Sequence, residues 1–205
     1  MNIFQKFVNY IITLIGKVRW KPKNYVTQEE LDQLRALLKA NYYLILTRNN
    51  NHLSTYAIAV GNFLITGKWG FWGHVLMNLE NTVTTDADFR LIEAIGSGVT
   101  YSPFNSVFAV NCVCLLKPKS MTIDQWTLIM DKANTELGKP YDTLFDLKND
   151  NAINCVELVR SSLMTEPNYA TDFANFEKDI AKAKNLTPDM FFSCSDFEIV
   201  YLVKH

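Results

Sequence analysis

The stretch "AINCVELVRSSL", residues 152–163, places a single cysteine at the start of a run with helical periodicity. If the helix begins near Asn154, Cys155 lies in its first turn, where the helix dipole and unpaired N–H groups favour a thiolate. Cys155 also falls on the apolar stripe of this helix, and free cysteines are among the most buried residues. By itself the stretch favours a core cysteine. A nucleophile is the alternative, and it needs a base and an orienting group elsewhere in the chain.

His74 is the candidate base, because it directly follows a glycine and begins an apolar run that is typical of a strand. A general base must approach the thiol to about 3 Å, and a strand end beside a helix N-terminus can provide that approach. A structural role for this histidine is the alternative. Of the three histidines in the chain, His74 is the one we place beside the thiol.

Glu93 is the candidate orienting group. It stands inside the otherwise apolar segment "LIEAIG", residues 91–96. Strand alternation places Leu91, Glu93 and Ile95 on one face, so the carboxylate shares a side with apolar residues and needs a partner. An imidazole N–H can be that partner, which gives a nucleophile, a base and an orienting acid. The alternative is a solvated Glu93 on an exposed face.

The remaining periodicity predicts an α+β fold with a mainly antiparallel sheet packed against helices, plus N-terminal helices. A capping-box spacing between Thr27 and Glu30 starts one helix, and a second helix runs from Thr122 to a stop at Gly138. Further helices are expected at Cys155 and over 173–185. The expected strands cover residues 42–48, 55–61, 74 onward, 88–95, 106–118 and 197–203.

Composition excludes several classes of protein. Apolar residues make up 48% of the 205 residues and charged residues 20%, which is typical of a globular chain. A net charge of −1 with scattered Lys and Arg argues against a nucleic-acid partner. The four cysteines follow no secretory signal and form no CxxC or His cluster, so we expect reduced thiols and no metal site. No cofactor is expected either.

The first 20 residues form an amphipathic pattern with a basic flank. Their apolar positions recur at helical period, and Lys6, Lys17 and Arg19 supply the flanking charge. The apolar run is shorter than the roughly 20 residues that span a bilayer. Two interpretations remain open for residues 1–20: a helix packed on its own domain, or peripheral contact with a membrane surface.

Four short motifs occur in an order that resembles a known family. They are "GHVLMNLE" (73–80), "LIEAIGSGV" (91–99), "GKPYDTLF" (138–145) and "NCVELV" (154–159). Together with a closing segment over 185–203, they resemble the circularly permuted NlpC-type, papain-like cysteine hydrolases, the YiiX/YebB-like proteins. The resemblance covers roughly residues 40–202. It implies an N-terminal helical extension over 1–39 and a papain-like cysteine hydrolase domain over 40–205.

The resemblance also implies roles for individual residues. Cys155 becomes the nucleophile, His74 the base, and Glu93 the group that orients the imidazole. Tyr141 matches the tyrosine of the family's "PY" element near the cleft, and we assign it to substrate binding together with Trp72 of "WGFWG". A core position is the alternative for Trp72. Val156 and the segment Asn41-Tyr42-Tyr43 depart from the family's usual residues, a serine and Gly-Asp, which leaves the substrate class open.

The function implied is a cysteine hydrolase that cleaves an amide bond through a thioester. The substrate would be a peptide, with cell-wall peptides as one candidate class. Two alternatives stay open: a lipid-directed acyl hydrolase or acyltransferase at a membrane surface, and an inactive binding or virion protein of the same fold. The corresponding locations are the cytoplasm, a virion or a membrane periphery.

Overall fold

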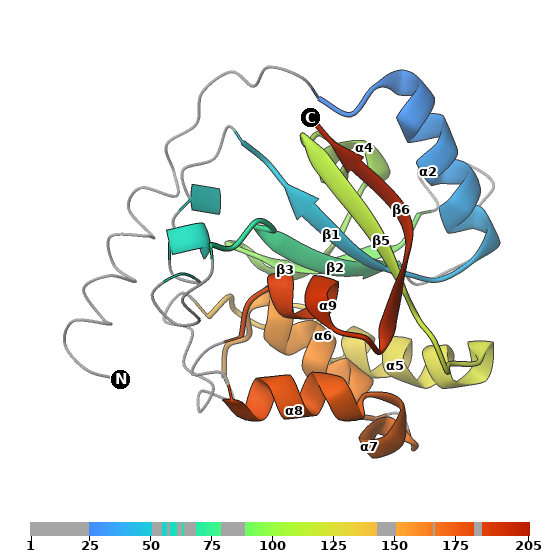
Figure 1. The fold of residues 1–205 in the computed structure, drawn as a ribbon, viewed down its shortest axis with the longest axis vertical. Helices are drawn as coiled ribbons and strands as arrows, with labels where there is room; N and C mark the ends of the chain where they lie inside the picture. Colours follow the sequence, from blue (N-terminus) through green and yellow to red (C-terminus); the bar gives the residue numbers. More distant parts are fainter. Residues whose placement is uncertain are drawn as a thin grey trace.

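The fold is built on one six-stranded sheet in which every neighbouring pair is antiparallel. The computed structural model describes residues 25–50, 55–56, 58–60, 63, 69–78, 89–142, 151–165, 167–182 and 186–205. The strands are β1 (Leu44–Arg48), β2 (His74–Asn78), β3 (Leu91–Ile95), β4 (Gly98–Ser102), β5 (Cys112–Pro118) and β6 (Phe197–Lys204). Their order across the sheet is β4-β3-β2-β1-β5-β6 (Figure 1). The mixed helix and antiparallel-sheet class expected from the sequence is confirmed.

One face of the sheet packs against the helices that follow β5. These are α5 (Ile123–Thr135), α6 (Cys155–Leu163), α7 (Tyr169–Asp172), α8 (Ala174–Lys182) and α9 (Asp189–Ser193). Figure 1 shows them gathered below the sheet. The core on this side combines residues of β2 and β3, such as Val75 and Ile92, with Trp126 of α5 and Leu158 of α6. Helix α6 therefore lies directly under the strands that carry the candidate base and acid.

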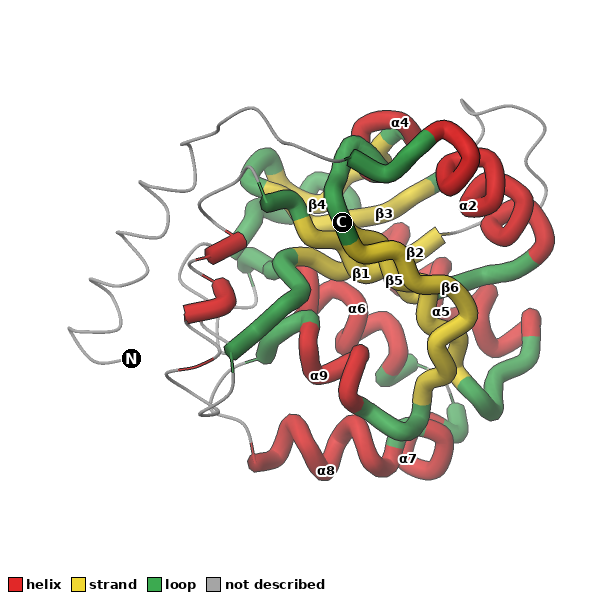
Figure 2. Tube along the Cα trace, turned by 45° about the horizontal axis from the view of Figure 1, so that its top comes forward, coloured by secondary structure: helices red, strands yellow, loops and turns green. Residues whose placement is uncertain are grey.

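The other face is covered by α2 (Gln28–Ala40) and the short α4 (Phe104–Val107). Figure 2 shows both helices on the side of the sheet opposite α5, α6 and α8. Leu34 and Leu38 of α2 are fully buried in this second core beside Ile45 and Leu76 of the sheet. The predicted capping box of α2 is present, with the Thr27 and Glu30 side chains each bonded to the other's backbone N–H. Central strands such as β1 are thus buried on both faces.

Two of the strand predictions were wrong in part. Residues 55–56 and 58–60 are helical, although "TYAIAVG" predicts a strand. Thr55 and Ala59 are buried, while Tyr56 and Val60 are exposed. Buried positions therefore recur four residues apart, as on one face of a helix, and not two apart, as in a strand. The strand expected over 106–118 begins only at Cys112. Before it, α4 follows Pro103, because Phe104 turns inward to pack in the second core.

The N-terminal predictions fall largely outside the described residues. This applies to the amphipathic pattern over residues 1–20. Helix α2 is described, and it packs on the sheet as part of the second core. The proposed boundary between residues 39 and 40 stays a prediction. Among the described residues, no helix has the length and apolar character needed to cross a membrane.

Candidate active site

Cys155 is the first residue of α6, and its position is fixed by the cap of that helix. The Asn154 side chain accepts hydrogen bonds from the N–H groups of Val156 (3.0 Å) and Glu157 (3.1 Å). In return, Glu157 Oε2 accepts the Asn154 N–H at 2.8 Å. This reciprocal capping box holds the first turn in place. The Cys155 side chain therefore sits at the positive end of the helix, with 5% of the residue exposed.

His74 lies at the start of β2, just beyond the part of that strand that pairs with β3. The two strands pair only at Met77–Ile92 and Asn78–Leu91. Gly73 before it donates its N–H to Thr47 O at 3.1 Å. A Cβ on Gly73 would lie 3.2 Å from the Thr55 side chain, so little space remains there for another residue type. Backbone packing thus fixes where the imidazole emerges from the sheet.

Glu93 meets His74 where β2 and β3 no longer pair. Its Oε2 lies 2.6 Å from His74 Nε2, and its Oε1 accepts a hydrogen bond from Ser102 Oγ on β4. Only 8% of Glu93 is exposed, so the alternative of a solvated carboxylate is wrong. With Nε2 directed at Glu93, Nδ1 is the ring nitrogen available to Cys155.

The charges of the three groups are linked. Burial acts to lower the pKa of His74, but the charge and hydrogen bond of Cys155, followed by those of Glu93, outweigh it and raise the pKa to about 10. Burial likewise acts to raise the pKa of Glu93, and the His74 and Ser102 bonds bring it below its ordinary value. These directions favour a protonated His74 imidazole that contacts the ionised Glu93 carboxylate on one side and Cys155 on the other.

The other cysteines differ from Cys155 in their surroundings. All four are free and buried. Burial is the main cause that raises the pKa of Cys112, of Cys114 to about 12, and of Cys194 to about 11. These three thiols are therefore protonated at neutral pH.

Tyr141 lies beside Cys155 because a short backbone bridge joins the two segments. Asp142 N–H donates to Ile153 O (3.2 Å), and Ile153 N–H donates to Pro140 O (2.9 Å). Burial, and then the charge of Cys155, raise the pKa of Tyr141 well above its ordinary value. Its hydroxyl thus stays protonated, within reach of the charge of Cys155. The structure brings Tyr141, His74, Glu93 and Cys155 together.

Trp72 occupies a different environment from these residues. It is 1% exposed and packs edge-on against Phe71 and at a tilt against Phe192. The Phe71 and Trp72 N–H groups both donate to Asp189 Oδ1, at 2.8 and 3.3 Å. This burial supports the core alternative for Trp72. Its contact with substrate stays a prediction without an exposed surface to support it.

Sequence reasoning missed Ser102, and it placed the start of α6 near Asn154 without inferring the capping role of that residue. The signal for Ser102 was the pair Gly96-Ser97, because a two-residue turn between Ile95 and Gly98 sets Leu91 opposite Ser102. The signal for Asn154 was its spacing to Glu157, which matches a capping box. In the described part of the chain, no group of three or more His, Cys, Asp or Glu side chains is arranged to hold a metal ion.

Comparison with known proteins gives two matches. The sequence model of a family described as permuted papain-like amidase enzymes, YaeF/YiiX, C92 family, matches residues 45–201. Among solved structures, the crystal structure of the metalloprotein yiiX from Escherichia coli O157:H7 has a similar fold, with a TM-score of 0.57 at 18% sequence identity. The match covers 80% of this chain and 97% of that one. No curated protein matches the sequence.

Proposed function

The chain belongs to the C92 family of permuted papain-like amidases of the YaeF/YiiX type, and we propose that Cys155, His74 and Glu93 carry out its amide hydrolysis. The observation that supports this assignment is the position of His74, which interacts with Glu93 through Nε2 and with Cys155. An imidazole held in this way can exchange a proton with the thiol and with a leaving group.

The first step proposed is attack of the Cys155 thiolate on the carbonyl carbon of the amide. A C–S bond forms as the carbonyl π pair moves to oxygen, which gives a tetrahedral oxyanion. The N–H groups of Val156 and Glu157 are bonded to Asn154, so they are not the donors for this oxyanion. We assign that role to the N–H of Cys155 at the start of α6, assisted by the helix dipole. We propose the hydroxyl of Tyr141, whose pKa the charge of Cys155 helps to raise, as a second donor to this oxyanion.

The second step breaks the C–N bond. The oxyanion collapses, the His74 imidazolium gives its proton to the departing amine, and a thioester on Cys155 remains. Neutral His74 then takes a proton from water, whose oxygen attacks the thioester. Collapse of this second intermediate breaks the C–S bond, releases a carboxylic acid and returns the Cys155 thiolate with the His74 imidazolium. Glu93 accepts the Nε2–H bond throughout and keeps Nδ1 directed at the reacting atoms.

The test uses the reactivity of the thiol, because it does not depend on knowing the substrate. The folded protein is treated with limiting iodoacetamide at pH 6.5, and each cysteine is quantified by mass spectrometry. We expect Cys155 to react far faster than Cys112, Cys114 and Cys194, which serve as internal controls. His74→Ala should reduce the rate at Cys155. Equal labelling of all four cysteines, or protection of Cys155, would contradict the assignment.

For the substrate, we propose a peptide amide, with cell-wall peptides as the first class to test. Purified protein and the Cys155→Ala variant are compared on peptide amides, muropeptides and long-chain acyl esters. Release of amine from a peptide by the wild type but not by the variant is the expected result. Turnover of the acyl esters alone would replace the peptide assignment with the lipid one.

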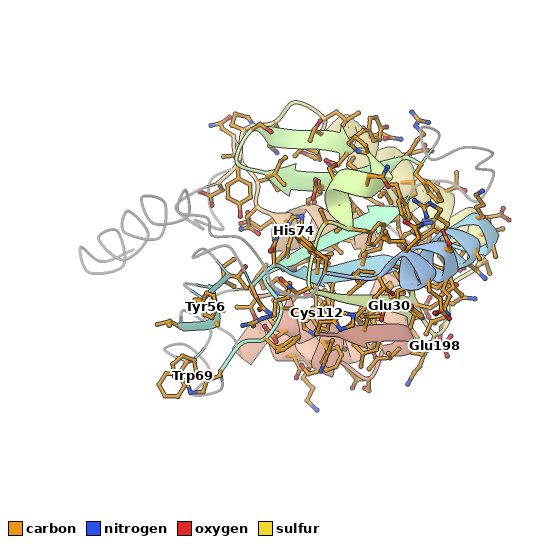
Figure 3. All side chains as sticks on the ribbon, turned by 90° about the horizontal axis from the view of Figure 1, so that it is seen from above. Glu30, Tyr56, Trp69, His74, Cys112 and Glu198 are labelled. Carbon is orange, nitrogen blue, oxygen red and sulfur yellow. The ribbon has the colours of Figure 1, made fainter. Side chains whose placement is uncertain are left out.

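One observation favours the lipid-directed alternative as a second candidate. Tyr56, Val60 and Phe63 follow a helical spacing, yet they are 39%, 42% and 39% exposed. Trp69 is 67% exposed and stacks on Phe63, with ring centroids 4.7 Å apart. Tyr56 and Trp69 stand at one edge of the molecule (Figure 3). Exposed aromatic side chains suit the interface of a bilayer.

Vesicle binding tests this second candidate. The protein is sedimented with phosphatidylcholine vesicles with and without phosphatidylglycerol. Trp69→Ser should reduce binding, and Leu128→Ser, at a residue of α5 that is 46% exposed, should not. A chain without residues 1–20 separates the contribution of the amphipathic N-terminal sequence. Absence of binding by the full chain would remove the lipid candidate.

A further inference from the structure

Ser102 supplies the second hydrogen bond to the buried carboxylate of Glu93. Its Oγ donates a hydrogen bond to Glu93 Oε1, while Glu93 Oε2 interacts with His74 Nε2 at 2.6 Å. Ser102 is itself 8% exposed, so this bond is shielded from water. The four side chains form a sequence of contacts from β4 through β3 and β2 to α6: Ser102, Glu93, His74 and Cys155.

The register of the β3–β4 hairpin explains why this serine reaches Glu93. Leu91 faces Ser102 and Glu93 faces Thr100 across the two strands. Ser102 and Glu93 are therefore diagonal neighbours on the same face, a separation that a long side chain can span. Thr100 lies directly opposite Glu93, but its hydroxyl bonds to Tyr101 O at 3.3 Å. The bond to Glu93 is thus specific to Ser102.

The chemistry of a buried carboxylate explains what this bond can do. Burial favours the neutral acid, and a nearby positive charge and donors to its oxygens keep such a group ionised. Each oxygen of Glu93 has one donor, from His74 and from Ser102. Without Ser102, Oε1 would be a buried acceptor with no hydrogen bond, and the carboxylate could rotate to find another donor for it. The oxygen that faces His74 would then no longer be fixed.

Strand β4 is anchored firmly enough to hold Ser102 in place. Val99 N–H donates to Lys139 O at 2.9 Å, and Gly138 N–H donates to Val99 O at 2.9 Å. The Tyr101 hydroxyl also bonds to Asn134 Oδ1 on α5. These contacts tie an edge strand of the sheet to the C-terminal part of α5 and the segment that follows it. Ser102 therefore approaches Glu93 from a fixed backbone.

We propose that Ser102 is a positioning residue of the active site: it holds Glu93 ionised and in the orientation that supports the imidazolium of His74. The inference rests on the proposed function. It adds a fourth residue, which acts through Glu93. Threonine can make the same bond, and alanine cannot.

The test measures the rate at which iodoacetamide alkylates Cys155 between pH 5 and pH 10. Ser102→Ala should lower the rate about 10-fold or more at pH 6–7, the effect of one hydrogen bond to a charged group. The loss should shrink above about pH 9, where thiols ionise without help. Ser102→Thr should restore the rate, and Thr100→Val, the matched control on the same strand and face, should leave it unchanged.

A double variant separates positioning from general stability. If Ser102 acts through Glu93, then Ser102→Ala should cause no further loss in the Glu93→Gln background. Additive losses, a loss that is equal at every pH, or no loss in Ser102→Ala would overturn the inference. Slow alkylation of Cys155 in the wild type would instead contradict the proposed function, so the two failures are distinguishable.

Discussion

Glu93 and His74 are in contact although they occupy strands that do not pair at these positions. Their side chains meet at 2.6 Å beyond the last paired residues of β2 and β3. The gap between the strands leaves room for both side chains, and Ser102 closes it from β4. The arrangement fixes which nitrogen of His74 faces the acid. It leaves the other nitrogen for Cys155.

Replacing Glu93 tests this contact directly. Glu93→Gln keeps the shape but removes the charge that supports the imidazolium, so alkylation of Cys155 at pH 6.5 should fall roughly 10-fold. The control is Glu136→Gln, at a second buried carboxylate that bonds to Lys132 and Lys139. That variant should lose stability and keep the alkylation rate. An equal effect of the two variants would mean that charge loss acts only on the fold.

The protonation of His74 can be followed by nuclear magnetic resonance, since the chain has only three histidines. Burial opposes the charged ring, but Cys155 and Glu93 raise its pKa to about 10. The ring should therefore stay protonated from pH 6.5 to about pH 9 and lose its proton near pH 10. In Cys155→Ala the main raising cause is absent, so the pKa should fall. A wild-type ring that titrates near 6.5, as in an unfolded chain, would contradict this arrangement.

Local patterns predicted most of this site from the sequence. Helical periodicity located α6 and its cysteine. Strand alternation placed Glu93 on the same face of its strand as Leu91, which is buried in the second core. His74 at the start of β2 followed from the glycine before it. These are short-range features, and short-range sterics and burial determine them.

The residues that the sequence did not reveal depend on packing between distant segments. The helical state of residues 55–56 and 58–60 goes with the packing of Thr55 against Gly73, a contact that no local pattern shows. The inward position of Trp72 depends on α9, whose Asp189 binds the backbone of Phe71 and Trp72. The role of Ser102 required the hairpin register. Each of these three features depends on contact with a residue far away in the chain or on the exact register of two strands, and neither can be read from a local sequence pattern.

The cap of α6 should make a measurable contribution to stability. Asn154→Ala removes two hydrogen bonds from its side chain, and we expect the free energy of unfolding in urea to fall by about 1 kcal/mol. Asn154→Asp should recover most of it. Asn168 is a matched control, because it caps the short α7 without a side-chain bond. Asn168→Ala should change stability little, and an equal loss in both variants would contradict the assigned cap.

Gly98 should be intolerant of a side chain. Its φ is +108°, and a Cβ there would lie 2.7 Å from Lys139 O. Gly98→Ala should lower the free energy of unfolding by at least about 1 kcal/mol, from backbone strain alone. A Cβ on Gly96, in the same turn, would meet no atom within 4 Å, so Gly96→Ala is the control and should be tolerated. Thermal unfolding of the two variants would show the difference.

The order of the strands along the chain has a consequence for biosynthesis. A ribosome makes the base, the acid and the serine before it makes the thiol, since β2, β3 and β4 all precede α6. Cys155 meets its base only once α6 packs against β2 and β3, and the sheet itself is completed by β6, which is made last, so an activated thiol requires the whole domain to have been synthesised.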